Sequence, residues 1–204
     1  YQLIISSWHS YRVKPWIIYG PKGTKKFVSK IMDAWKDERT QRIKYENRSS
    51  TAAFKTIIKE FKSTGNVNIK DLRIKYFEVD HKPVEFSYGF NFFNKKKKLT
   101  ISGDTRPCEN LMKYAQDADV LLHEVFIDGE FKETNKMRTK KTLHNVRDYH
   151  TPSTLLGKIA KLTNCKKLVL THLVPTKFNE KKLKKTIKFD FGKNHIIGKD
   201  LLKI

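Results

Sequence analysis

The sequence Ile-Ser-Gly-Asp-Thr-Arg-Pro at residues 101–107 decides how this chain is interpreted. It ends an apolar, strand-like run, and Gly103 then permits a tight turn that carries Asp104. A carboxylate at such a turn can bridge two divalent cations, as two-metal hydrolysis requires. The alternative is that Asp104 caps the helix expected from Pro107, because aspartate is also a good N-cap residue.

Three downstream segments extend this pattern: Leu-Leu-His-Glu at 121–124, Tyr-His-Thr-Pro-Ser at 149–153 and Leu-Thr-His at 170–172. Each places an acid or an imidazole beside a strand-like run or a helix start. His172 ends the buried run before it, where a neutral imidazole can bind a metal. Taken alone, a histidine in this position is more often a part-buried core residue.

The order of strand-like and helix-like segments predicts an α/β fold, with residues 1–204 as a single domain. We expect helices from about 24 to 35, 107 to 115 and 151 to 162, and from Asn179. A weaker helix is expected from Ala52 to Phe61. The rest of 36–70 and all of 127–149 are expected to be loop. The expected strands are 16–19, 72–79, 85–93, 99–102, 119–126, 167–173 and 195–197.

His150 is a candidate of a second kind. His150 precedes the helix expected from Thr151, and the free N–H groups of a helix start suit a phosphate or sulfate oxygen. The alternative is that His150 merely flanks the helix cap. His123 should point to the opposite face of its strand from Glu124, so we interpret it as structural. The histidines without motif context are His9, His144 and His195.

Together these segments resemble the second half of a metallo-β-lactamase-fold hydrolase, in the ribonuclease Z-like and arylsulfatase-like branch. Residues 102–107 resemble the bridging-aspartate motif, and 170–172 the terminal metal histidine. His81, followed by Ser-Tyr-Gly-Phe at 87–90, resembles the third motif. The resemblance implies a four-layer αβ/βα sandwich, here incomplete at the amino terminus. The first metal motif, His-x-His-x-Asp-His, is absent from the 204 residues.

The resemblance also implies the roles of the site residues. His81, Asp104 and His172 would bind metal, two Zn²⁺ per site in the intact enzyme. His150 would protonate the leaving oxygen and Glu124 would orient it. A catalytic zinc normally has three protein ligands and an open position. We therefore expect this chain alone to bind metal poorly, as the carboxy-terminal portion of a longer enzyme.

The resemblance predicts a metal-dependent hydrolase of phosphodiester, sulfate or other ester bonds. The spacing from Phe90 to Asp104 leaves no room between these motifs for the long tRNA-clamping arm of bacterial ribonuclease Z. A tRNA substrate is therefore not favoured. The alternative function is a catalytically inactive basic module that binds RNA or a protein partner. The joint presence of His81, Asp104, His150 and His172 favours the hydrolase.

The net charge of +22 bears on the partner. One explanation is attraction to phosphate, most simply that of RNA. The other is a lysine-biased composition, since arginine, whose guanidinium binds phosphate through two parallel hydrogen bonds, is scarce. We expect a cytoplasmic protein with no membrane span. A homodimer is one expectation, because family members often dimerise. Cys108 and Cys165 form no disulfide framework and are interpreted as reduced bystanders.

Overall fold

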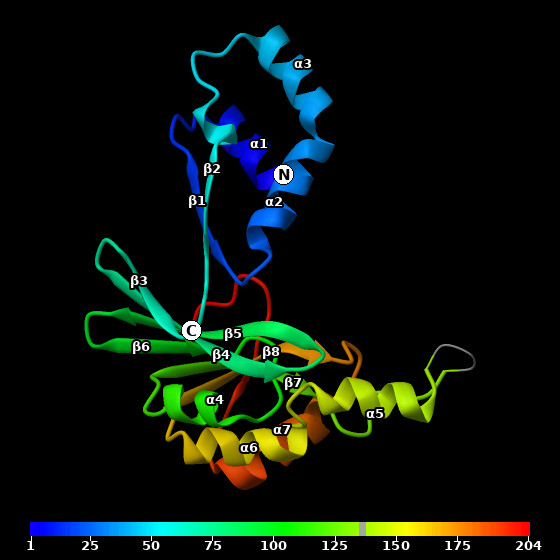
Figure 1. Ribbon diagram of the computed structural model, residues 1–204. Coiled ribbons are helices and arrows are strands. Elements are labelled where there is room, and N and C mark those ends of the chain that lie inside the picture. The colour runs from blue at the N-terminus through cyan, green and yellow to red at the C-terminus, as the bar shows by residue number, and fades with distance from the viewer. Residues whose placement is uncertain (135–137) are drawn as a thin grey trace. The chain divides into compact units, whose positions relative to one another are not determined.

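The computed structural model describes residues 1–134 and 138–204, which form two compact units, residues 1–62 and 63–204 (Figure 1). Each unit has its own secondary structure and its own buried side chains, so each is described by itself. The single domain over residues 1–204 stays a prediction.

The first unit contains a short parallel sheet and its helices. Strands β1 and β2 pair in parallel, with Trp16 opposite Thr56 and Gly20 opposite Glu60. The buried apolar side chains of this unit centre on Trp8. Its elements are α1 (Gln2–His9), β1 (Trp16–Gly20), α2 (Thr24–Ala34), α3 (Lys36–Glu46), the 3₁₀ turn η1 (Ala52–Phe54) and β2 (Thr56–Glu60).

Two sequence predictions were wrong in this unit. The helix expected over Ala52 to Phe61 is η1 followed by strand β2. The β-branched residues of β2 fit a strand, and pairing with β1 satisfies their backbone groups. The loop expected after residue 35 is largely helix α3, which carries Asp37 and Glu38 in its first turn and an i,i+4 ion pair between Glu38 and Arg42. Both features stabilise a helix that has no apolar face.

The second unit is built on a seven-stranded sheet of order β3-β4-β5-β6-β7-β8-β9. The pairs from β3 to β6 are antiparallel, and those from β6 to β9 are parallel. The parallel strands end along one edge, which suits a functional site. The strands are β3 (Gly65–Ile69), β4 (Leu72–His81), β5 (Val84–Asn94), β6 (Lys97–Ile101), β7 (Val120–Phe126), β8 (Lys167–Val174) and β9 (Ile196–Ile197).

Helices α4 (Glu109–Tyr114), α6 (Ser153–Leu162) and α7 (Glu180–Phe191) cover one face of this sheet (Figure 1). The core between the layers includes Leu121, Leu168 and Leu170 from β7 and β8, together with Leu156 and Ile187 from α6 and α7. These side chains are almost completely buried, so the core holds β7 and β8 against α6 and α7.

Two further segments expected to be loop contain regular structure. Residues 127–149 contain helix α5 (Lys140–Asp148), whose N-cap Thr139 forms a capping box with Thr142. The end of the segment 36–70 contains strand β3, which pairs with β4. In both cases the stabilising partner is either a single cap or the strand that follows, and neither produces a strong periodic pattern.

The predicted α/β class is confirmed, and the main expected strands of the second unit are present. Across residues 1–134 and 138–204, no helix combines the length and the apolar composition needed to cross a membrane. Both cysteines are free, and burial raises the pKa of Cys165 to about 11, so its thiol is protonated at neutral pH.

Candidate active site

His172 is presented by a β-bulge. The register of β7 and β8 shifts between Glu124 and Val125, so that Thr171 and Leu173 pair with β7 and His172 is left out. Its φ of +42° is left-handed, a conformation that costs energy for a residue other than glycine. The bulge re-aims the imidazole away from the ladder, toward the edge of the sheet where the other candidates lie.

His81 lies at a second register shift, at the end of β4. Its Nδ1 is 2.8 Å from the carbonyl oxygen of Tyr149, so Nδ1–H donates to that oxygen and Nε2 remains available as an acceptor or ligand. The ring of Tyr149 packs edge-on against His81, 5.0 Å between centroids. The hydrogen bond fixes both the orientation and the tautomer of the imidazole, as happens for histidines that bind metals.

Asp104 lies on the turn after β6, and the turn requires glycine at position 103. Gly103 has φ of +63°, and a Cβ atom there would lie 2.4 Å from the carbonyl oxygen of Tyr88. The hydroxyl of Ser87 donates to the Asp104 carbonyl at 3.0 Å. These contacts hold the carboxylate at the edge of the sheet, where Oδ2 is 3.4 Å from Nε2 of His172.

Glu124 is the buried centre of the site. Its Oε1 accepts hydrogen bonds from the backbone N–H groups of Thr151, at 2.8 Å, and Thr105, at 3.2 Å. Nδ1 of His150 lies 3.3 Å from the same oxygen. Glu124 is 1% exposed and His150 5%, so water screens their interaction very little. A carboxylate in this position can hold an imidazole in one orientation.

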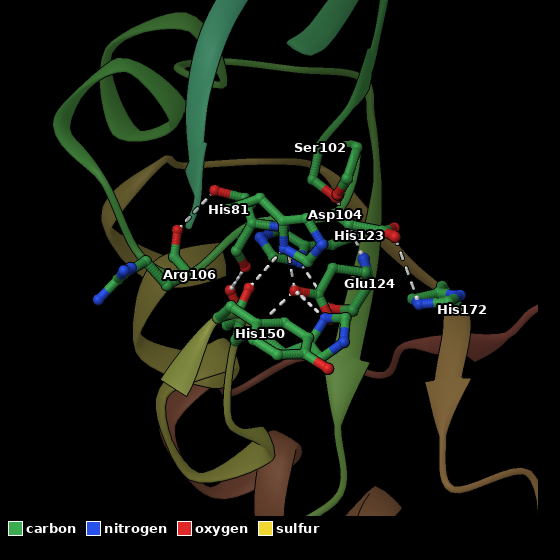
Figure 2. Close-up of polar contacts among 12 residues, drawn as sticks. His81, Ser102, Asp104, Arg106, His123, Glu124, His150 and His172 are labelled. Carbon is green, nitrogen blue, oxygen red and sulfur yellow. Dashed lines mark hydrogen bonds and ion pairs between the residues drawn. The ribbon is translucent and has the colours of Figure 1, made fainter. Parts of the chain in front are cut away.

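The five candidates come together at one edge of the sheet (Figure 2). The ring centroid of His150 is 5.2 Å from that of His81 and 5.3 Å from that of His172. Asp104 pairs with His172 on one side, and Glu124 lies beside His150. Three imidazoles and two carboxylates from β4, β7, β8 and two connecting segments therefore face a common region. This grouping is suited to acid–base chemistry or to metal binding.

Known proteins resemble this chain in sequence and fold. No family model matches it. Ribonuclease Z of Mycolicibacterium gilvum (strain PYR-GCK) is 29% identical over 163 residues, 79% of this chain and 55% of that protein. Ribonuclease Z of Latilactobacillus sakei subsp. sakei (strain 23K) is 28% identical over 201 residues, 78% of this chain and 60% of that protein. The chain thus spans little more than half of these relatives.

Solved structures agree on the fold. The metallo-β-lactamase fold protein YhfI of Bacillus subtilis superimposes with a TM-score of 0.64 at 18% identity, over 91% of this chain and 63% of YhfI. The short form of human tRNase Z gives a TM-score of 0.57 at 18% identity, over 92% of this chain and 65% of that protein. The chain therefore has the metallo-β-lactamase fold, and its sequence is similar to that of ribonuclease Z.

The donor types at this site suit zinc, but the donors are few. His81 offers a free Nε2, and Asp104 and His172 lie in contact. Within the described part of the chain, however, no three His, Cys, Asp or Glu side chains are arranged to hold one metal ion. These residues therefore fit as part of a zinc site and do not complete one by themselves.

Several supporting groups were not predicted from the sequence. The Tyr149 carbonyl fixes His81, and the N–H groups of Thr105 and Thr151 fix Glu124. These contacts use backbone atoms, which leave no sequence signal. Arg106 was also missed, although it lies within the quoted motif. Its guanidinium is within 3.4 Å of the carboxylates of Asp80 and Asp148, so it joins the ends of β4 and α5 beside the site.

The remaining histidines lie outside this grouping. His123 is fully buried, its Nδ1 is 2.7 Å from the Glu124 carbonyl oxygen, and burial lowers its pKa. A neutral imidazole held in this way supports the backbone of β7. His9 lies in the first unit, with Nε2 3.4 Å from a carboxylate oxygen of Glu46. His195 is buried beside β9, and burial also lowers its pKa.

Proposed function

We propose that this chain carries the second half of the active site of a metal-dependent phosphodiesterase related to ribonuclease Z. The observation that carries the proposal is the placement of His150. Its Nδ1 faces the buried carboxylate of Glu124 at 3.3 Å, while its ring lies between those of His81 and His172. An imidazole oriented by an acid, next to candidate metal donors, is the arrangement needed to protonate a leaving oxygen.

His81, Asp104 and His172 are proposed to bind zinc, with Asp104 shared between two ions. Zinc would supply Lewis-acid stabilisation of a phosphoryl oxygen and an activated water. The hydrogen bond from His81 to the Tyr149 carbonyl leaves Nε2 as the donor atom. Further ligands, of the kind that a His-x-His-x-Asp-His segment provides, are absent from the 204 residues, so a segment outside them would complete the site.

His150 is proposed as the general acid. With Nδ1 directed to Glu124, Nε2 is the atom that delivers a proton to the leaving oxygen. Glu124 is proposed to hold the imidazole in the orientation that this transfer requires. Its own position is set by the N–H groups of Thr105 and Thr151, so the acid and its orienting group form one rigid arrangement.

A phosphodiester, and RNA in particular, is the substrate class we favour over sulfate esters. The net charge of +22 attracts polyanions. The relatives are named ribonuclease Z, and a diphosphatase of the PhnP family superimposes with a TM-score of 0.53 at 13% identity. A cytoplasmic location and homodimer formation remain predictions.

The test uses the natural protein that contains these residues, loaded with Zn²⁺ and assayed on bis(p-nitrophenyl) phosphate. His150→Ala should lower turnover by about 10²-fold or more while the bound zinc, measured by plasma mass spectrometry, stays constant. Asp104→Ala should remove both zinc and turnover. The matched control is His144→Ala, an exposed histidine of α5, which should change neither quantity.

Two results would contradict the proposal. Equal loss of zinc in His150→Ala and Asp104→Ala would mean that His150 is a ligand and not an acid. RNA binding by the zinc-loaded natural protein without any phosphodiester turnover would favour the alternative function, an inactive basic module. One observation supports this alternative. Within the described residues, no three His, Cys, Asp or Glu side chains are arranged to hold one metal ion.

A further inference from the structure

The first unit contains a pocket that the proposed hydrolase site does not use. It has a volume of about 180 Å³ and lies between the end of α1 and the segment that follows α3. Its lining combines aromatic rings, guanidinium groups and small hydroxyl residues: Trp8, Tyr11, Arg12, Val13, Arg48, Ser49 and Ser50. Rings and arginines together are the usual components of a single-strand nucleic-acid site.

Both arginines stack on aromatic rings. The Arg12 guanidinium carbon lies 4.1 Å from the centroid of Trp16, and that of Arg48 lies 4.9 Å from Trp8 and 5.7 Å from Tyr11. Each guanidinium also donates one hydrogen bond to the backbone, Arg12 to the Pro15 carbonyl at 2.8 Å and Arg48 to the His9 carbonyl at 3.2 Å. Stacking and hydrogen bonding hold the two planes in place before any ligand arrives.

Arg12 has donor capacity that the chain does not use. Its Nε is buried and finds no hydrogen-bond partner among the residues described. The Arg12 side chain lines the pocket, and no carboxylate of the described residues forms an ion pair with it, so its charge is available to a ligand. Arg48 differs, because its Nε already lies 2.6 Å from a carboxylate oxygen of Glu46. Arg12 is therefore the main side chain for binding an anion. Its single positive charge matches one phosphate group.

Tyr11 presents an open ring beside these arginines. Its side chain is 85% exposed, although burial of a tyrosine ring would normally be favourable. Its φ is +62°, a strained value for an aromatic residue, and its N–H donates to the Trp8 carbonyl at 3.1 Å. The backbone at the end of α1 thus holds the ring outward, where a nucleobase can stack on it.

We infer that this pocket binds one nucleotide of a single-stranded RNA. The base stacks on Tyr11, and its phosphate accepts hydrogen bonds from Arg12, with Arg48 beside it. The inference goes beyond the proposed function and requires neither metal nor hydrolysis. It assigns a specific contact to the strongly basic chain, whose charge alone would attract any polyanion.

The test is the binding of a fluorescein-labelled oligouridylate of eight nucleotides to the 204-residue chain, followed by anisotropy at about 150 mM salt. Tyr11→Ala should raise Kd at least about fivefold, because a stacked base contributes that much or more. Tyr45→Ala is the matched control, since Tyr45 is 93% exposed in the same unit and lies outside the pocket. The Kd of this variant should equal that of the parent chain.

The salt dependence of Kd tests the role of Arg12. Arg12→Gln should reduce the slope of log Kd against log salt by about 0.7, the value for one phosphate of a single strand. Arg12→Lys should retain the slope. The three tryptophans, Trp8, Trp16 and Trp35, all lie in the first unit, so RNA should quench tryptophan fluorescence as it binds. Equal Kd values for Tyr11→Ala and Tyr45→Ala, or an unchanged slope in Arg12→Gln, would overturn the inference.

Discussion

Glu124 is the residue on which the geometry of the candidate active site depends. Its Oε1 accepts two backbone N–H groups and faces His150. Glu124→Gln keeps a carbonyl acceptor but removes the negative charge that faces His150. We expect turnover of the natural protein to fall by about 10²-fold, within the range of general acid catalysis. The measurement is phosphodiester turnover at constant zinc content.

Glu124→Ala is the matched comparison for that prediction. It leaves the N–H groups of Thr105 and Thr151 buried without an acceptor. Each unsatisfied N–H lowers the free energy of unfolding by about 1–3 kcal/mol. Thermal unfolding followed by circular dichroism should therefore show a larger loss of stability for alanine than for glutamine. If both variants unfold alike, the two backbone hydrogen bonds do not hold the carboxylate.

The sequence was sufficient to predict which side chains gather at the site, and the limit of that prediction has a physical cause. His81, Glu124 and His172 lie in strands, and Asp104 and His150 lie in connecting segments beside a strand or a helix start. The structure brings all five to one edge. The bulge at His172 and the carbonyl of Tyr149 were not predictable. Both depend on backbone geometry that many sequences can adopt.

At the scale of elements, Asp128 links three parts of the second unit. Its carboxylate accepts hydrogen bonds from the N–H and the hydroxyl of Thr154 at the start of α6, at 3.1 and 2.8 Å, and from Arg147 of α5 at 2.8 Å. Burial alone would raise its pKa, but the hydrogen bonds from Arg147 and Thr154 lower the pKa overall. Asp128 thus caps the helix that follows His150.

We predict that Asp128→Ala lowers the free energy of unfolding by about 1–2 kcal/mol at pH 7, as the loss of a helix cap does. Because the folded pKa of Asp128 is lowered, its contribution is present above the unfolded value, about 3.9, and is lost as the pH falls through the folded value. Urea unfolding should show the difference from the parent chain shrinking between pH 6 and pH 2. Asp71→Ala, at an exposed aspartate, is the control.

The contact between α6 and α7 depends on Gly157. A Cβ atom there would lie 2.5 Å from the Ile187 carbonyl oxygen and 3.0 Å from Cβ of Asp190. Alanine normally favours a helix over glycine by about 1 kcal/mol, but here the backbone of α7 must move. Gly157→Ala should therefore destabilise the second unit by about 1–3 kcal/mol, measured by thermal unfolding. A higher unfolding temperature for Gly157→Ala would mean that α6 and α7 can move apart without losing packing energy. Lys158→Ala, at the exposed neighbour, controls for helix propensity.

Elements with a local signal were predicted better than elements without one. Strands β7 and β8 each contain a run of buried apolar residues, and α6 has an apolar stripe, so their sequences define them. Helix α3 has no buried side chain, and β3 exists through its pairing with β4. Such elements are stabilised by charged side chains or by strand pairing, and neither gives a periodic apolar pattern.

At the scale of the whole molecule, the two units have separate cores. The core cluster of the second unit, from Phe77 to Phe191, contains no residue of the first unit. The buried apolar side chains of the first unit are few, and they are Ile4, Ile5, Trp8, Ala53 and Phe61. A unit of 62 residues buries a smaller share of its unfolded surface than a larger domain does, so it is marginally stable by itself.

This division predicts that unfolding proceeds in two steps. All three tryptophans lie in the first unit, so their fluorescence reports that unit alone, while far-ultraviolet circular dichroism reports the helices of both units. The circular dichroism signal in urea should fall in two steps, and the first step should coincide with the fluorescence transition, because the smaller core contributes less stability. The core variant Leu168→Ala should lower the midpoint of the second circular dichroism step and leave that of fluorescence unchanged. Coincident transitions, shifted together by that substitution, would mean that the two units unfold as one cooperative structure.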